Sequence, residues 1–396
     1  MATTEPVQFN PLAPETIEDP YPLYHRLRTE DPVHQSPAGI WVLSRYDDVG
    51  LALRDARFGR RGFQELITAR FGGPGFGNSM LLQDPPDHTR LRTLVSKAFT
   101  PRAIEGLRAQ IVSMVDGLLD QAGDRGEMDL IADLAYPLPA SVICEMLGVP
   151  LVDRDRLREW SADIARSLDA LIVSEPELIT RAKAAGLALR EYFEHLVGER
   201  RRAPRADILS ALIAAEEAGD QLSTDELFAT VVLLFLAGHE TTANLIGNGV
   251  LALLRHPAEL ARLRDDPSLV ESAVEELLRY DSPVQRVSRI TSADVVINDH
   301  TIPRGSLVLA LIASANRDPA YFPEPDRLDL ARRDNRHLAF GSGIHFCLGA
   351  PLARLEGRIV LAALLRRCPR LALATDRVEW RQTFALRALV SLPVRF

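Results

Sequence analysis

The chain has 396 residues, of which 46% are hydrophobic and 25% are charged, the balance of a globular protein rather than of a disordered or fibrous one. A formal net charge of -8 excludes a general nucleic-acid binder, because no basic excess is available to neutralise the phosphates of a duplex. Three cysteines are too few, and wrongly spaced, for a disulfide framework or a zinc site.

The N-terminal residues lack the basic start and the apolar stretch of a secretory signal or membrane anchor, so we expect a cytoplasmic protein. The longest apolar run, residues 231–238, is far shorter than the roughly 20 residues that span a bilayer and predicts a buried helix. No internal repeat or linker divides the chain. We therefore expect one domain over residues 1–396, monomeric and not bound to a membrane.

The first predicted element is a strand at residues 40–46, which follow a Pro-Ala-Gly turn and are rich in β-branched and aromatic residues. Residues 84–92 open a helix after two prolines. Helical spacing of apolar residues then predicts helices over residues 101–122, 140–147, 153–171 and 177–199.

A long helix is predicted over residues 223–254. Ser223 and Glu226 form a capping-box pattern at its start, and Pro257 lies just beyond its end. A helix of this length measures about 50 Å and would cross the whole molecule. Its apolar pattern is interrupted at residues 238–242, where a core helix should remain apolar.

Beyond this helix, residues 270–280 again have helical spacing. A short β region follows at residues 294–297, 301–302 and 308–312, with polar turns between the segments. A last helix is predicted over residues 349–367. The fold class is therefore mainly α with a small β region.

Residues 340–349 place three glycines around Cys347, directly before that last helix. A helix N-terminus favours a negative sulfur, which predicts a lowered pKa for the thiol. Glycines would allow a flat cofactor to approach the backbone. A lone cysteine of this kind is also compatible with a buried residue in a glycine-rich turn.

The pattern Phe-Gly-x-Gly-x-His-x-Cys-x-Gly over residues 340–349 resembles the heme-binding loop of cytochromes P450. The resemblance implies heme b held between the long helix and the cysteine-loop helix, with Cys347 as the axial iron ligand and the metal-binding residue. It also implies that His345 binds a heme propionate and that Phe340, Gly341 and Gly349 belong to the cofactor site. Thiolate ligation favours cleavage of the O–O bond.

The break in the long helix resembles the oxygen-activation segment of that family. Ala237 and Gly238 match its pair of small residues, which lie against the cofactor, and Glu240 and Thr241 match its acid-alcohol pair. Splitting dioxygen consumes protons, so a hydroxyl and a carboxylate here would deliver them. Standing alone, the motif would more simply be a satisfied polar pair in a buried helix.

Three further basic residues match propionate-binding positions of the family, namely His88, Arg92 and Arg289. A guanidinium suits a carboxylate because it donates two parallel hydrogen bonds.

The Glu-x-x-Arg helix of the family corresponds to Glu276 and Arg279, and its later arginine to Arg327. The resemblance implies that these three side chains form a buried structural network, although an acid and a base three residues apart usually form a surface pair.

The expected activity is that of a monooxygenase, which uses O2 and two electrons to hydroxylate or epoxidise a small hydrophobic molecule such as a terpenoid, steroid, fatty acid or polyketide. The chain has no flavin or nicotinamide fingerprint, so ferredoxin with ferredoxin reductase is the expected electron donor. A positive face near the cysteine would attract this partner through Arg92, Lys97, Arg102, Arg354 and Arg358.

Two alternatives remain open: a peroxide-driven hydroxylase or decarboxylase, and a non-catalytic heme protein that senses or carries a ligand. In any of these, the residues expected to face the bound molecule are Phe63, Ile67, Leu81, Leu82, Leu234, Val284 and Val287. Ordinary core packing explains this apolar set equally well.

Overall fold

The structure is a computed structural model, and it describes residues 7–63, 65, 78–123, 125–172, 175–217 and 222–396. Most of the described chain is helical. The helices that precede residue 224 are α1 (Pro14–Glu18), α2 (Tyr21–Glu30), α3 (Tyr46–Arg54), α5 (Asp87–Ser96), α6 (Pro101–Gly106), α7 (Arg108–Gly123), α8 (Pro137–Leu147), α9 (Arg154–Ser167), α10 (Pro176–Arg202) and α11 (Ile208–Glu217). Those that follow are α12 (Thr224–Arg255), α13 (Pro257–Asp265), α14 (Val270–Tyr280), α15 (Ile312–Ala315) and α16 (Ala350–Arg367).

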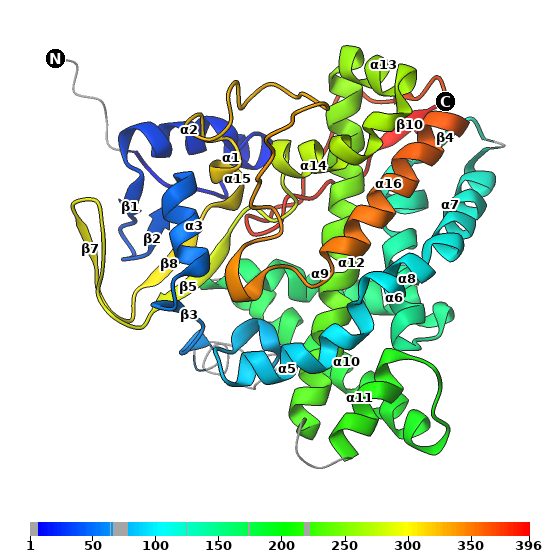
Figure 1. Cartoon of the computed structure of the whole chain (residues 1–396), viewed down its shortest axis with the longest axis horizontal. Helices are drawn as coiled ribbons and strands as arrows, with labels where there is room; N and C mark the ends of the chain where they lie inside the picture. Colours follow the sequence, from blue (N-terminus) through cyan, green and yellow to red (C-terminus); the bar gives the residue numbers. More distant parts are fainter. Residues whose placement is uncertain (1–6, 64, 66–77, 124, 173–174, 218–221) are drawn as a thin grey trace.

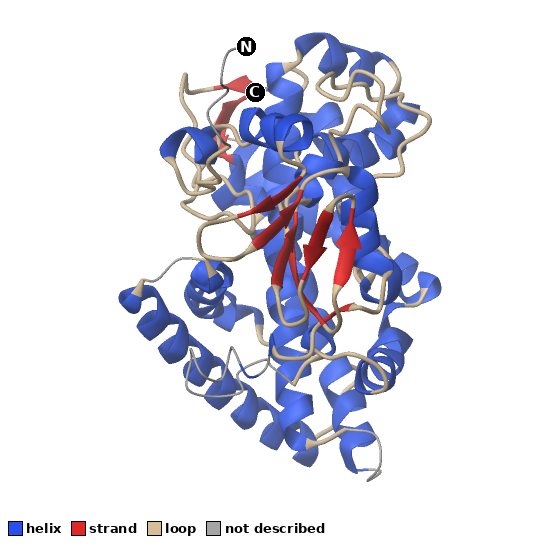
Figure 2. Cartoon of the chain, turned by 90° about the vertical axis from the view of Figure 1, so that its left-hand side faces the viewer, coloured by secondary structure: helices blue, strands red, loops and turns tan. Residues whose placement is uncertain are grey.

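The strands form three small sheets. The largest has the order β1-β2-β8-β5-β3, built from β1 (Val33–Gln35), β2 (Trp41–Leu43), β3 (Phe58–Gly59), β5 (Val287–Thr291) and β8 (Leu307–Ala310). The second contains β4 (Glu127–Asp129), β9 (Ala372–Leu373) and β10 (Pro393–Arg395), and the third is the hairpin of β6 (Val295–Ile297) and β7 (His300–Ile302). Figure 2 shows the largest sheet as one layer beside the helices.

Helix α12 is the centre of the helical part, and Figure 1 shows it passing through the molecule with α16 beside it and the largest sheet to one side. It packs against α8, α10, α14 and α16, so its apolar side chains form much of the main core. By length and composition α12 is the one described helix that could cross a bilayer, but 72% of its most apolar window is buried within the fold.

The predicted mainly helical class is confirmed. Ser223 caps α12 through a complete capping box with Glu226, as the sequence predicts, and α14 has the predicted bounds. The predicted helix at residues 101–122 is divided into α6 and α7, and residues 153–171 form α9 followed by the 3-10 turn η5 (Leu168–Leu171). The predicted strand at residues 40–46 is shorter, because Tyr46 already begins α3.

Candidate functional site

The loop around Cys347 folds back on itself before α16 begins. The Cys347 N–H group donates to the Phe340 carbonyl over 2.9 Å, which closes the loop. Gly341 and Gly343 have φ angles of +71° and +70°, where other residues are strained. A Cβ atom on Gly343 would also lie 2.6 Å from the Leu53 carbonyl oxygen. Gly341 and Gly343 are therefore required by the turn itself.

Burial raises the pKa of the Cys347 thiol, and this effect is opposed by the backbone N–H groups of Gly349 and Ala350 and by the charge of Arg92. The sequence predicted a lowered pKa for this thiol. That prediction is wrong for the protein without heme, because the effect of desolvation on the pKa outweighs that of the helix N-terminus. A buried thiol of this kind becomes a thiolate when it coordinates a metal cation.

Basic side chains from separate segments gather beside this loop. The His88 ring on α5 lies 4.4 Å from the His345 ring, measured between centroids. Within the part of the chain that the structure describes, both ring nitrogens of His88 and the Nε2 atom of His345 are buried without a hydrogen-bond partner. Burial lowers the pKa of His88, and burial together with nearby cations, Arg60 foremost, lowers that of His345 to about 2.

Two of the predicted arginines join this cluster. Arg92 donates to the Phe346 carbonyl oxygen over 2.6 Å, which ties α5 to the cysteine loop. Arg289 on β5 is 2% exposed and donates to the Ser288 carbonyl over 2.9 Å. These basic groups form no ion pair with an acidic side chain among the described residues, and they fit a ligand that carries carboxylates, which is what heme propionates provide.

The interrupted part of α12 presents small residues in an otherwise buried helix. Ala237 is exposed, whereas the residues on both sides of this turn are mostly buried. A Cβ atom on Gly238 would lie 2.6 Å from the side chain of Ile143 on α8. The Thr241 hydroxyl donates to the Ala237 carbonyl over 3.2 Å, so it is held on the same turn.

Glu240 is buried, and its carboxylate accepts a hydrogen bond from the Arg381 guanidinium over 2.6 Å. The second carboxylate oxygen lies 3.9 Å from Nε2 of His239. Burial lowers the pKa of His239, and its Nδ1 donates to the Phe235 carbonyl over 2.7 Å, while its Nε2 lies 3.1 Å from the Ser161 hydroxyl, which donates to the Arg158 carbonyl. Sequence reasoning missed Arg381, which is 141 residues from its partner and belongs to no recognisable motif.

Comparison with protein families identifies residues 32–383 as a match to the cytochrome P450 model. The chain belongs to the cytochrome P450 family. It is 46% identical to cytochrome P450 107B1 of Saccharopolyspora erythraea, over 96% of this chain and 95% of the relative. It is 44% identical to the vitamin D(3) 25-hydroxylase of Pseudonocardia autotrophica, over 95% and 94% of the two chains.

The fold is also shared with solved P450 structures. One is P450BioI in complex with an acyl carrier protein that carries hexadec-9Z-enoic acid, with a TM-score of 0.91 and 41% identity over 96% of this chain and 99% of that one. The protein is thus a cytochrome P450 monooxygenase of the bacterial type, and its cofactor is heme b.

The buried network of this P450 differs from the predicted one in its third member. Glu276 and Arg279 are fully buried and share two hydrogen bonds of 2.8 Å. The prediction for Arg327 is wrong: its guanidinium pairs with Glu324 at the surface, and only its carbonyl oxygen accepts from Arg279. Arg332 takes the predicted place, with Nε 3.2 Å from both Glu276 oxygens.

The residues predicted to face the substrate differ widely in how far they are buried. Phe63, Leu82 and Leu234 are buried, Val284 and Val287 are half-buried, and Leu81 is 37% exposed, whereas Ile67 lies outside the described residues. Val284 forms an isolated β-bridge with Leu386 of the C-terminal segment. Nothing in these contacts distinguishes a substrate surface from ordinary packing for this set.

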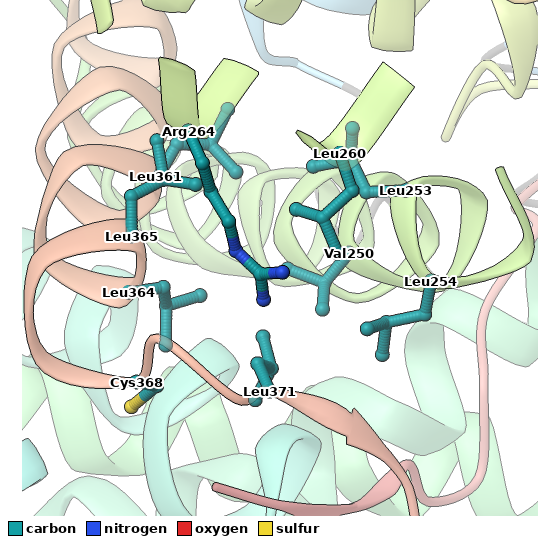
Figure 3. A pocket seen from close by; sticks show the side chains of 10 residues that line it. All are labelled: Val250, Leu253, Leu254, Leu260, Arg264, Leu361, Leu364, Leu365, Cys368 and Leu371. Atoms are coloured by element: carbon teal, nitrogen blue, oxygen red, sulfur yellow. The ribbon is translucent and has the colours of Figure 1, made fainter. Parts of the chain in front are cut away.

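A pocket elsewhere in the molecule is too small for a substrate. It lies among leucines of α12, α13 and α16, with Arg264 reaching into it and Cys368 at its edge (Figure 3). Its volume of about 20 Å³ holds about one water molecule.

Proposed function

We propose that this P450 hydroxylates or epoxidises a small hydrophobic molecule, with two electrons supplied by a ferredoxin and its reductase. The observation that carries the proposal is the pair on α12: a buried carboxylate, Glu240, held by Arg381, directly before Thr241 at the small-residue turn. A non-catalytic heme protein, or one that uses peroxide, has no need of a proton path of this kind.

The residues that would hold heme are those of the cysteine loop and of the basic cluster. Cys347 would supply the thiolate, and His88, Arg92, Arg289 and His345 would bind the propionates. Bound heme supplies the iron that activates dioxygen for insertion of one oxygen atom into a C–H or C=C bond. The further cofactor-contact residues in this proposal are Ala237, Gly238, Phe340, Gly341 and Gly349.

Glu240 and Thr241 would deliver the protons that the reaction consumes. One Glu240 oxygen is engaged by Arg381, which fixes the carboxylate and leaves the other oxygen to carry a proton. The Thr241 hydroxyl, which rests on the Ala237 carbonyl, can turn to donate to a neighbouring acceptor. These two residues are the proposed catalytic pair.

The ferredoxin would dock over the cysteine loop. Arg354 and Arg358 of the predicted positive face are neutralised, because they pair with Glu275 and Glu271 at 2.7 and 2.6 Å. Lys97 and Arg102 remain exposed there. Phe346 and Ile344 of the cysteine loop are 42% and 50% exposed. Exposed apolar side chains together with basic ones suit an acidic protein partner.

The proposed substrate is a terpenoid, steroid, fatty acid or polyketide. The names of the relatives support this range, since one acts on vitamin D(3) and another is seen with a fatty acyl chain on a carrier protein. The residues proposed to face the substrate are apolar, which suits such molecules.

Turnover with a ferredoxin system tests the proposal. The purified protein should give the reduced carbonyl spectrum of sulfur ligation and should convert at least one member of a panel of hydrophobic metabolites when NADH, reductase and ferredoxin are supplied. Thr241→Ala should consume reductant and release hydrogen peroxide in place of product. Conversion with peroxide alone, or fully coupled turnover by Thr241→Ala, would contradict the proposal.

A further inference from the structure

A second buried arginine lies next to Arg289, and no motif of the sequence marks it. Strands β3 and β5 are antiparallel, with Gly59 opposite Ile290; Arg60 directly follows β3, and continuing this register would place it opposite Arg289. Arg60 is 7% exposed. Burial, together with the charge of Arg289, holds the pKa of Arg60 well below its usual range, and burial lowers that of Arg289 to about 10. Two buried like charges that act on each other are unfavourable unless an anion balances them.

The acid that lies nearest to these arginines does not balance them. The Asp84 carboxylate accepts the backbone N–H groups of Arg60, over 2.9 Å, and of Arg61, over 2.8 Å. No hydrogen bond between Asp84 and either guanidinium is present in the described chain, and the Nε atom of Arg60 is buried without a partner. Asp84 therefore fixes the backbone that carries Arg60, whose guanidinium lies 5.5 Å over the Phe63 ring and is not engaged by this carboxylate.

The same aspartate connects Arg60 to the segment that carries two other basic residues of the cluster. The Asp84 carbonyl oxygen accepts from the N–H group of His88, so it begins helix α5, where Arg92 lies one turn further on. Segments distant in the sequence thus place Arg60 within the basic cluster described above.

We propose that Arg60 is an additional heme-propionate ligand that shares a carboxylate with Arg289. This inference rests on the proposed heme site and adds to it a position that the family resemblance does not supply. Arg60, Arg92 and Arg289 carry three positive charges against the single negative charge of Asp84. The two propionates of heme b make the count three against three, and a buried guanidinium gains two parallel hydrogen bonds from a carboxylate.

Heme release measures this role directly. Arg60→Met should transfer heme to excess apomyoglobin on the order of 10- to 100-fold faster than the parent protein, since a hydrogen bond to a charged group is lost. Arg61→Met is the matched control: its side chain is exposed, and its backbone N–H group contacts the same Asp84. Its release rate should match that of the parent within about two-fold, whereas Arg60→Lys, which keeps the charge but not the fork, should be intermediate.

Two further measurements separate this role from a structural one. Without heme, Arg60→Met should unfold at the same urea concentration as the parent or a higher one, because an unbalanced buried charge has been removed. A residue needed only for folding would lower that midpoint. When the proteins are reconstituted with hemin whose propionates are methyl esters, the parent and Arg60→Met should release it at the same rate.

Equal release of unmodified heme by Arg60→Met and Arg61→Met would overturn the assignment. A second outcome would also overturn it: Arg60→Met loses the spectral response to a C14 fatty acid but keeps the response to its methyl ester, and its heme release is unchanged. Arg60 would then bind the substrate. Failure of the proposed function is distinguishable, since inactive protein can still bind heme and show the predicted difference in release.

Discussion

Replacing Arg332 by glutamine should destabilise the folded P450 by about 3 kcal/mol, because it removes one cation from the fully buried carboxylate of Glu276. Arg332 is 9% exposed in its side chain, and its Nε atom lies 3.2 Å from both Glu276 oxygens. Its Nη1 atom also donates to the Pro323 carbonyl over 2.9 Å. Arg279 keeps its two bonds to Glu276, so the loss should stay near the lower end of the roughly 3–5 kcal/mol that a broken buried pair costs.

Urea unfolding of the heme-loaded protein, followed by far-ultraviolet circular dichroism, measures this difference as a shift of the midpoint. Arg327→Gln is the matched control. Its ion pair with Glu324 leaves the two side chains 57% and 72% exposed, and such pairs contribute about 0.5 kcal/mol or less. A loss for Arg327→Gln as large as that for Arg332→Gln would refute the assignment of the network.

Arg381→Met should release Glu240 and lower the product formed per NADH severalfold, measured by chromatography, while reduction by dithionite is unchanged. Gly238→Ala should lower the free energy of unfolding by about 1–3 kcal/mol, because its Cβ atom meets a packed side chain. Gly186→Ala, with open space around it, should raise the free energy of unfolding by about 0.5–1 kcal/mol, and thermal unfolding measures both changes. Burial opposes ionisation of Glu275, but hydrogen bonds from its basic neighbours lower its pKa to about 2. The stabilisation from the ionised Glu275 is complete above about pH 5 and is lost as the pH falls toward 2. Glu275→Gln should therefore weaken the pH dependence of the urea midpoint across this range.

The features that the sequence predicts well are those that depend on neighbouring residues. The capping box of Ser223 and Glu226 acts within one turn, and it fixes the start of α12 as predicted. The amphipathic repeat of α14 likewise gives its bounds. Gly341 and Gly343 before Cys347 are dictated by positive φ angles, which are a local property of the loop.

Contacts between distant segments could not be read in this way. Arg327 and Arg332 lie in one irregular loop, and nothing in their spacing shows which guanidinium turns inward to Glu276. The loop's main chain faces Arg279, so the carbonyl of Arg327 is used and its side chain is directed outward. Arg381 and Glu240 meet only because the C-terminal segment packs beside α12.

Buried charge explains both why Arg60 could not be found from the sequence and why we propose that it binds a carboxylate. Hydropathy patterns place arginines at the surface, so Arg60 passes as an ordinary residue after a short strand. In the fold it is buried beside Arg289, where desolvation and repulsion both act against it. Two unpaired buried arginines destabilise the protein without its ligand. A bound ligand with two carboxylates would offset this destabilisation for both arginines. The instability of the cluster alone is therefore the physical argument for its ligand.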